Sequence, residues 1–210
     1  MFLLDSIDRH ITVALNYDGG PVQDCIWLAF SSRLIWVLPA VALIAYLYAN
    51  RRTRSKTLMV IVALAVIVTL CDQTTSSLMK PYFARLRPSH TPGVENLLHY
   101  VNGYRGGQYG FASSHAANSF GAVTFVSLFL RKWRVSVALF ALALCVCFSR
   151  IYLGVHFFGD ITVGTLIGTL IGYLVYKIVT FKWTLPPWLN TQYITKLLCC
   201  FQAAHTGKRQ

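Results

Sequence analysis

Long apolar stretches alternate with short polar ones along most of this chain. Each apolar stretch approaches the roughly 20 residues that an α-helix needs to cross the hydrocarbon core of a bilayer. The five stretches cover about 25–48, 57–79, 113–130, 134–151 and 158–181. This pattern predicts an all-α fold, a polytopic membrane helix bundle with five to six transmembrane helices.

The first 20 residues follow a different pattern. Their apolar side chains recur at steps of three and four positions, at Leu3, Leu4, Ile7, Ile11 and Leu15. This spacing is typical of an amphipathic helix. We expect an N-terminal amphipathic helix that lies on the membrane surface or packs on the bundle. Acidic residues interrupt the segment, so we expect no cleavable signal peptide.

Composition and charge agree with a membrane protein and suggest its orientation. Hydrophobic residues make up 55% of the 210 residues and charged residues only 12%, with a formal net charge of +12. The basic segments 49–56 and 131–134 fall on one side of the expected bundle, which the positive-inside rule makes cytoplasmic. Four of the seven acids precede the first span, on the opposite side. No soluble basic module is evident, so we expect no nucleic-acid partner.

The same reasoning gives the expected domain organisation. Residues 1–181 form one membrane-embedded domain, and residues 182–210 form a cytoplasmic tail. The six cysteines show no CxxC spacing and indicate neither a disulfide framework nor a zinc site. The adjacent pair Cys199 and Cys200 leaves acylation of the tail open.

Three polar blocks interrupt the apolar pattern, and all three fall on the expected outer face. The first contains Lys80 and Arg87, which are seven positions apart, nearly two turns if the second span continues to Pro88. Such cations suit the oxygens of a phosphate, but they also suit snorkelling at a headgroup boundary. We assign Arg85 to that second interpretation, or to a headgroup contact.

The second block opens the third span. Ser113 and Ser114 can cap the helix and donate hydroxyl groups, and helix N-termini favour anions. His115, in the first turn, can deliver a proton. The alternative is a capped helix start that carries an interfacial histidine.

The third block carries the most specific pattern. His156 and Asp160 are four positions apart, so on a helix they would share a face. A carboxylate against one ring nitrogen fixes the tautomer and makes the other nitrogen a nucleophile. Arg150 lies six residues earlier, within reach of the same anion. The alternative is a buried ion pair with a structural role.

Together the three blocks resemble the motif of the type 2 phosphatidic acid phosphatase superfamily, membrane lipid phosphatases of the bacterial envelope type. The resemblance covers about residues 57–175, the expected catalytic core. The usual second block is Pro-Ser-Gly-His, and here Ala112 replaces the proline and Ser114 the glycine.

The resemblance implies a role for each residue. His156 would be the nucleophile that forms a phosphohistidine, Asp160 would orient it, and His115 would protonate the leaving oxygen and later activate water. The expected phosphate-binding residues are Lys80, Arg87, Arg150, Ser113 and Ser114. The resemblance implies no metal and no cofactor.

The expected function is therefore hydrolysis of a membrane lipid phosphate at the periplasmic face of the bacterial inner membrane. Our first expectation for the substrate is lipid A. Undecaprenyl diphosphate and phosphatidylglycerol phosphate remain alternatives. A rival of another class is a non-catalytic lipid-binding or transport protein. The oligomeric state cannot be read from the sequence.

Two further features leave alternatives open. Asp72, inside the second span, is a candidate functional residue. It could support Lys80 from below, or satisfy the neighbouring threonine and serine hydroxyl groups. Glycines at 164, 168 and 172 form a flat ridge, suited to packing inside the bundle or to a homodimer seam.

Overall fold

The computed structural model describes residues 2–181 and is almost entirely helical, which confirms the predicted fold class. Backbone pairing of the β type in this part of the chain is limited to one bridge between Leu86 and Tyr109. The α-helices are α1 (Phe2–Leu15), α2 (Gly20–Ser31), α3 (Val37–Ala49), α4 (Thr57–Asp72), α5 (Lys80–Phe83), α6 (Ser114–Leu130), α7 (Trp133–Tyr152) and α8 (Phe158–Phe181). The expected cytoplasmic tail, 182–210, lies outside the described residues.

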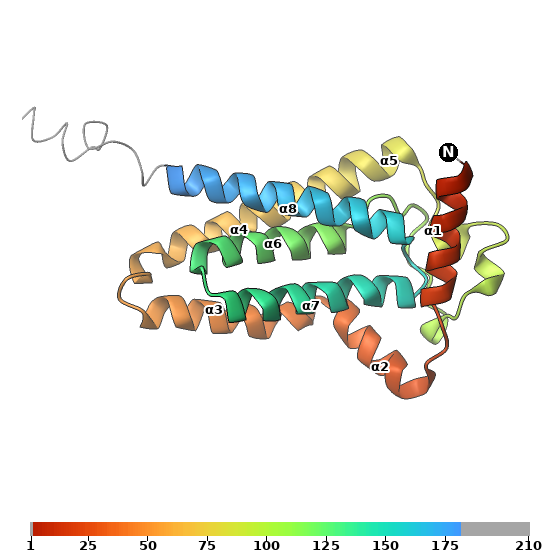
Figure 1. The fold of residues 1–210 in the computed structure, drawn as a ribbon, viewed down its shortest axis with the longest axis horizontal. Helices are drawn as coiled ribbons and strands as arrows, with labels where there is room; N and C mark the ends of the chain where they lie inside the picture. Colours follow the sequence, from red (N-terminus) through yellow and green to blue (C-terminus); the bar gives the residue numbers. More distant parts are fainter. Residues whose placement is uncertain (1, 182–210) are drawn as a thin grey trace, which may run out of the picture.

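Helices α3, α4, α6, α7 and α8 run roughly parallel to one another in a bundle (Figure 1). By length and composition, three helical segments of residues 2–181 can cross a membrane: Arg54–Phe83, Trp133–Tyr152 and Phe158–Phe181. The first expected span is broken: α2 and the segment Arg33–Ala49 meet at a bend of 63° and together make a fourth candidate. The third expected span is α6, whose 17 residues correspond to only about 25 Å of helix.

Helix α6 is the centre of the bundle and packs against α4, α7 and α8. Its contact with α8 depends on the glycine ridge. A Cβ atom at Gly164, Gly168 or Gly172 would fall on a carbonyl oxygen of α6, those of Ser113, Ala117 and Gly121 respectively. The ridge therefore lets two backbones touch, as small residues do in membrane helix pairs. This supports packing inside the bundle over a homodimer seam.

The second expected span is continuous but changes its winding near the site. It is an α-helix over α4, a π-helix over Gln73–Met79, and an α-helix again over α5. It ends at Phe83, where Ala84 takes a left-handed conformation with φ of 43°. The expectation that the helix continues to Pro88 was wrong.

Helix α1 lies across one end of the bundle, nearly at right angles to its axis (Figure 1). It packs against α7 and α8. Two of its side chains cap α8: Phe158 N donates to Thr12 Oγ1 at 3.1 Å, and Gly159 N donates to Asp8 Oδ1 at 2.8 Å. The amphipathic N-terminus therefore packs on the bundle and satisfies backbone donors that an α-helix leaves free.

Candidate active site

The three polar blocks meet at the end of the bundle that α1 covers. A cavity of about 1000 Å³ opens there. Its walls include six of the eight residues proposed from the sequence: Lys80, Arg87, Ser114, His115, Arg150 and His156. The other two, Ser113 and Asp160, are fully buried behind the wall.

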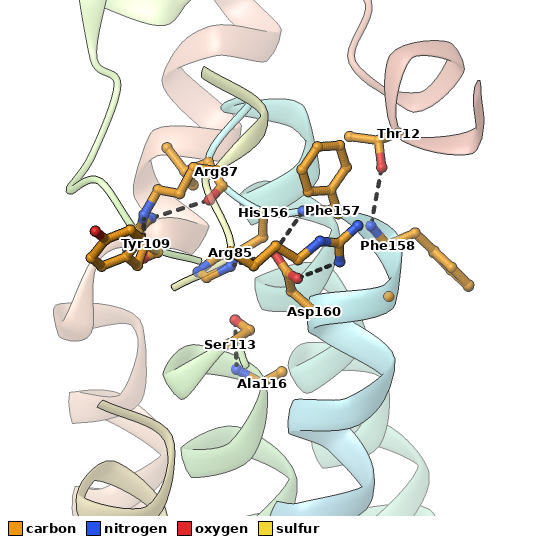
Figure 2. Close-up of polar contacts among 12 residues, drawn as sticks. Thr12, Arg85, Arg87, Tyr109, Ser113, Ala116, His156, Phe157, Phe158 and Asp160 are labelled. Atoms are coloured by element: carbon orange, nitrogen blue, oxygen red, sulfur yellow. Dashed lines mark hydrogen bonds and ion pairs between the residues drawn. The ribbon is translucent and has the colours of Figure 1, made fainter. Parts of the chain in front are cut away.

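His156 and Asp160 lie side by side at the start of α8 (Figure 2). His156 is in the turn before α8 and not on the helix, so the expectation of a shared helix face was wrong in its geometry. The two groups still meet, with His156 Nδ1 3.4 Å from Asp160 Oδ2. Asp160 Oδ2 also accepts from Phe157 N at 3.0 Å, which fixes the carboxylate within the turn.

The surroundings of His156 keep its imidazole neutral. Burial is the largest cause that lowers the pKa of His156 well below its ordinary value, and the nearby charges of Arg87, Arg150 and Lys80 add to it. A hydrogen bond with the backbone of Gly110 acts in the opposite direction. A neutral ring with Nδ1 beside a carboxylate leaves Nε2 free to attack an electrophile.

Arg85 is the residue that the sequence analysis assigned wrongly. Its guanidinium donates to Asp160 Oδ1 at 2.8 Å through Nη1 (Figure 2). It also donates to Asp8 Oδ2 at 2.6 Å through Nη2. It also lies over the Phe157 ring, 4.4 Å from its centroid. Arg85 is thus a bridge between α1 and the carboxylate behind His156, and not a headgroup contact.

The sequence held one signal for this bridge. The chain has only seven acids, and two of them, Asp5 and Asp8, stand in the first helix. Both form ion pairs with Arg85, Asp5 at the longer distance of 3.5 Å. Local spacing does not identify the partner, because Asp8 and Arg85 are 77 positions apart.

Lys80 is held by hydroxyl groups of two helices. Its Nζ donates to Ser114 Oγ at 3.0 Å and to Ser76 Oγ at 3.2 Å. Thr75 Oγ1 donates to the same Ser114 Oγ at 2.8 Å. Ser76 Oγ in turn donates to Asp72 Oδ1 at 3.2 Å. Asp72 is therefore linked to Lys80 through Ser76, which combines the two roles left open for it.

Arg87 reaches the cavity from a loop. Its backbone N donates to Gln108 O at 3.0 Å, and its side chain donates to Tyr109 O at 3.1 Å and to Val155 O at 3.2 Å. These bonds tie the segment after α5 to the residues that precede α6 and α8. Arg87 and Lys80 therefore reach the same cavity through tertiary packing and not because they share a helix face.

Arg150 approaches from the end of α7. One terminal nitrogen donates to Ser31 Oγ on α2. Its Nε is buried and has no hydrogen-bond partner within residues 2–181. A buried donor without a partner is costly, and an anion in the cavity would satisfy it.

The second block has the predicted capping role. Ser113 is the N-cap of α6 and accepts from Ala116 N at 3.5 Å (Figure 2). Ser113 N donates to Asp160 O at 3.0 Å, so the starts of α6 and α8 are tied together. His115 follows in the first turn and lines the cavity.

The described residues contain no group of three or more His, Cys, Asp or Glu side chains placed to hold a metal ion. What the site does offer is a neutral imidazole backed by a carboxylate, a second imidazole, three cations and a helix N-terminus. This set matches the requirements of phosphoryl transfer, in which cations stabilise the non-bridging oxygens while a nucleophile attacks in line.

Curated relatives carry names that refer to this chemistry. The chain is 35% identical over 175 residues to a lipid A 4'-phosphatase of Porphyromonas gingivalis, covering 83% of this chain and 74% of that protein. It is 37% identical over 177 residues to a lipid A 4'-phosphatase of Bacteroides thetaiotaomicron, covering 83% of this chain and 78% of that protein.

A solved structure supports the fold. The transmembrane PAP2 type phosphatidylglycerolphosphate phosphatase from Bacillus subtilis aligns with a TM-score of 0.65 and 20% identity, over 90% of each chain. The sequence itself matches the description of the PAP2 superfamily over residues 56–184, more than half of the chain. The chain therefore belongs to the PAP2 superfamily, whose motif was the resemblance noted in the sequence.

Proposed function

We propose that this protein is an integral membrane phosphatase that removes a phosphate from a lipid A-type glycolipid through a phosphohistidine on His156. The single observation that carries the reaction is the neutral, buried His156 with Nδ1 beside Asp160, at the wall of a cavity that Lys80, Arg87 and Arg150 also line. The names of the two bacterial relatives support lipid A as the substrate.

The first half of the reaction transfers the phosphoryl group. Lys80, Arg87 and Arg150 bind the non-bridging oxygens while Nε2 of His156 attacks phosphorus. The N–P bond forms as the bond from phosphorus to the lipid oxygen breaks, and His115 gives that oxygen its proton. Asp160 stabilises the positive charge that the ring of His156 acquires.

The second half restores the enzyme. His115, now unprotonated, removes a proton from water, and the resulting hydroxide attacks phosphorus. The N–P bond breaks and inorganic phosphate leaves. The residues supply the nucleophile, the acid and base, and the electrostatic stabilisation, so we propose that no metal is required.

The location of the site is part of the proposal. The basic segments 49–56 and 131–134 lie at the end of the bundle opposite to α1 (Figure 1). By the positive-inside rule that end is cytoplasmic, and the cavity then opens at the periplasmic face of the bacterial inner membrane.

The test is phosphate release by the purified protein in detergent, with EDTA present. The panel contains lipid A, undecaprenyl diphosphate, phosphatidylglycerol phosphate and phosphatidic acid, and a His156→Ala variant is measured alongside. We expect release from lipid A that EDTA leaves unchanged and that the variant lacks. Release from another lipid alone would change the substrate. No release from any, by a folded protein, would favour a lipid-binding or transport role.

A further inference from the structure

The cavity extends from the phosphate-handling residues along the bundle. On both walls, the side chains that line it change from charged to polar to apolar in the same order. On α6, His115 is followed one turn deeper by Asn118 and Ser119, and then by apolar side chains of the same wall. Across the cavity, Lys80 is followed by Gln73, Asp72 and Thr69, and then by apolar side chains of α4. Thr69, Asp72, Gln73, Asn118 and Ser119 therefore form a polar belt below the cations.

Burying this polar belt within a membrane protein costs free energy. It lies in Arg54–Phe83, a segment apolar enough to span a bilayer, and in the central helix of the bundle. Polar side chains at such positions are kept for function or for internal pairing. The π-helix of Gln73–Met79 begins within the belt, and π turns inside α-helices are frequent at functional sites.

Asn118 shows that internal pairing does not account for the whole belt. Its Oδ1 is buried and has no hydrogen-bond partner among the described residues. Asn118 lines the cavity three positions after His115, about 4.5 Å further along the helix axis. An unpaired amide oxygen beside a cavity is an acceptor for an O–H or N–H group of a ligand.

The belt as a whole is rich in acceptors. Asp72 offers a carboxylate that accepts from Ser76 Oγ and has capacity for further donors. Gln73 adds an amide, and Thr69 and Ser119 add hydroxyl groups. A hydrocarbon chain attached directly to the phosphate would leave the buried Asn118 Oδ1 without a partner. A group that carries hydroxyl or amide donors would satisfy it.

We propose that the polar belt is a specificity subsite for a hydroxyl- or amide-bearing group, such as a sugar ring, directly beyond the phosphate ester. This inference rests on the proposed phosphatase function and makes it more specific. Lys80, Arg87 and Arg150 bind the phosphate, His115 protonates the ester oxygen, and Asn118 accepts from the donor next to that oxygen. The subsite selects glycolipid phosphates over phosphates of simple hydrocarbon alcohols.

The test compares two substrates on matched variants. One substrate is lipid A, and the other is p-nitrophenyl phosphate, which has no donor beyond its phosphate. Asn118→Leu and Gln73→Leu remove polar groups of the belt. Thr124→Val is the control for α6, because Thr124 Oγ1 is also buried and unpartnered within residues 2–181 but does not line the cavity. Ser77→Ala is the control for the π-helix, because Ser77 lies within Gln73–Met79 but does not line the cavity.

The quantity measured is the ratio of kcat/KM for lipid A to kcat/KM for p-nitrophenyl phosphate. Loss of one hydrogen bond to the substrate lowers this ratio about 10- to 100-fold in Asn118→Leu and Gln73→Leu, and both controls keep the wild-type ratio. A ratio within about twofold of wild type in both belt variants would overturn the subsite. Hydrolysis of p-nitrophenyl phosphate but not of lipid A by the wild type would instead show that the proposed substrate is wrong, and the subsite would fall with it.

Discussion

Replacing Arg85 with methionine tests the structural link between α1 and the nucleophile. Methionine keeps an unbranched apolar stem but removes the guanidinium, and with it the contact of Arg85 Cζ with the Phe157 ring. Asp160, which is fully buried, then loses the donor at 2.8 Å and keeps only Phe157 N and the His156 ring. Asp8 loses its 2.6 Å partner in the same step.

The magnitude follows from burial. Breaking a buried ion pair by removing one partner costs about 3–5 kcal/mol, and a hydrogen bond to a charged group is worth about 1.5–3 kcal/mol. The side chain of Arg85 is 27% exposed, so water recovers part of this loss. We therefore expect the free energy of unfolding to fall by about 2–4 kcal/mol. We also expect kcat to fall, because the freed carboxylate no longer holds His156 in place.

The assay is a double-mutant cycle of unfolding in mixed micelles with Arg85→Met, Asp160→Asn and the double variant. Two groups in contact give a coupling free energy of about 2 kcal/mol. Arg105→Met is the control, because Arg105 is exposed and stacks on the Tyr100 ring at 4.7 Å. Additive effects of the two substitutions, or an equal loss in the control, would refute the reasoning.

Three further predictions concern packing, protonation and the N-terminus. Gly168→Leu forces a side chain onto a backbone carbonyl of α6 and lowers the free energy of unfolding by about 3 kcal/mol. Gly107→Ala is the control, because a Cβ at Gly107 meets nothing within 4 Å and has little effect. Similar melting curves for the two variants would contradict this prediction. The pKa of His156 is lowered by burial and nearby cations, so we expect kcat/KM to stay high as the pH falls through 6.5. A pH profile of kcat/KM with an acid limb centred at 6.5 would contradict this prediction. Asn16→Ala leaves the carbonyl of Tyr152 without its donor and destabilises by about 2 kcal/mol, measured by the same unfolding assay; an unchanged value would argue against this anchor.

The sequence predicts the helices well where an apolar stretch is long and has polar ends. The expected spans 134–151 and 158–181 correspond to α7 at Trp133–Tyr152 and α8 at Phe158–Phe181. Side-chain contacts made within one helical turn were also predictable. Ser113 caps α6 as its position before the helix indicated, since an N-cap depends on neighbours within one turn.

The break in the first expected span is local: it falls at Ser32, whose Oγ accepts from Leu34 N in the next turn, although the stretch is apolar on both sides. The errors at the second span and at Arg85 share another cause, which is that long-range contacts decide the outcome. The second span ends at Phe83 because the segment after it pairs with residues around Tyr109. Arg85 reaches Asp160 and Asp8 only once α1 lies across the bundle end, and no local spacing encodes that position.

The polar belt is an intermediate case. Asp72 was visible in the sequence as an ionisable residue within an apolar stretch, but its partners were not. The structure links it to Lys80 through Ser76 and sets it across a cavity from Asn118. Only the packing of α4 against α6 brings the two helix faces together, and the sequence alone does not show it.

The measurement that tests the central claim most directly is detection of phosphate on His156. The protein is mixed with p-nitrophenyl phosphate, quenched in alkaline detergent where phosphohistidine survives, digested, and analysed by mass spectrometry. His115→Ala raises the yield, because this leaving group needs no proton while hydrolysis of the intermediate still needs His115 as its base. We predict phosphate on His156 in the wild type, more of it in His115→Ala, and none in His156→Ala. Phosphate on another residue, or turnover by His156→Ala, would contradict the mechanism.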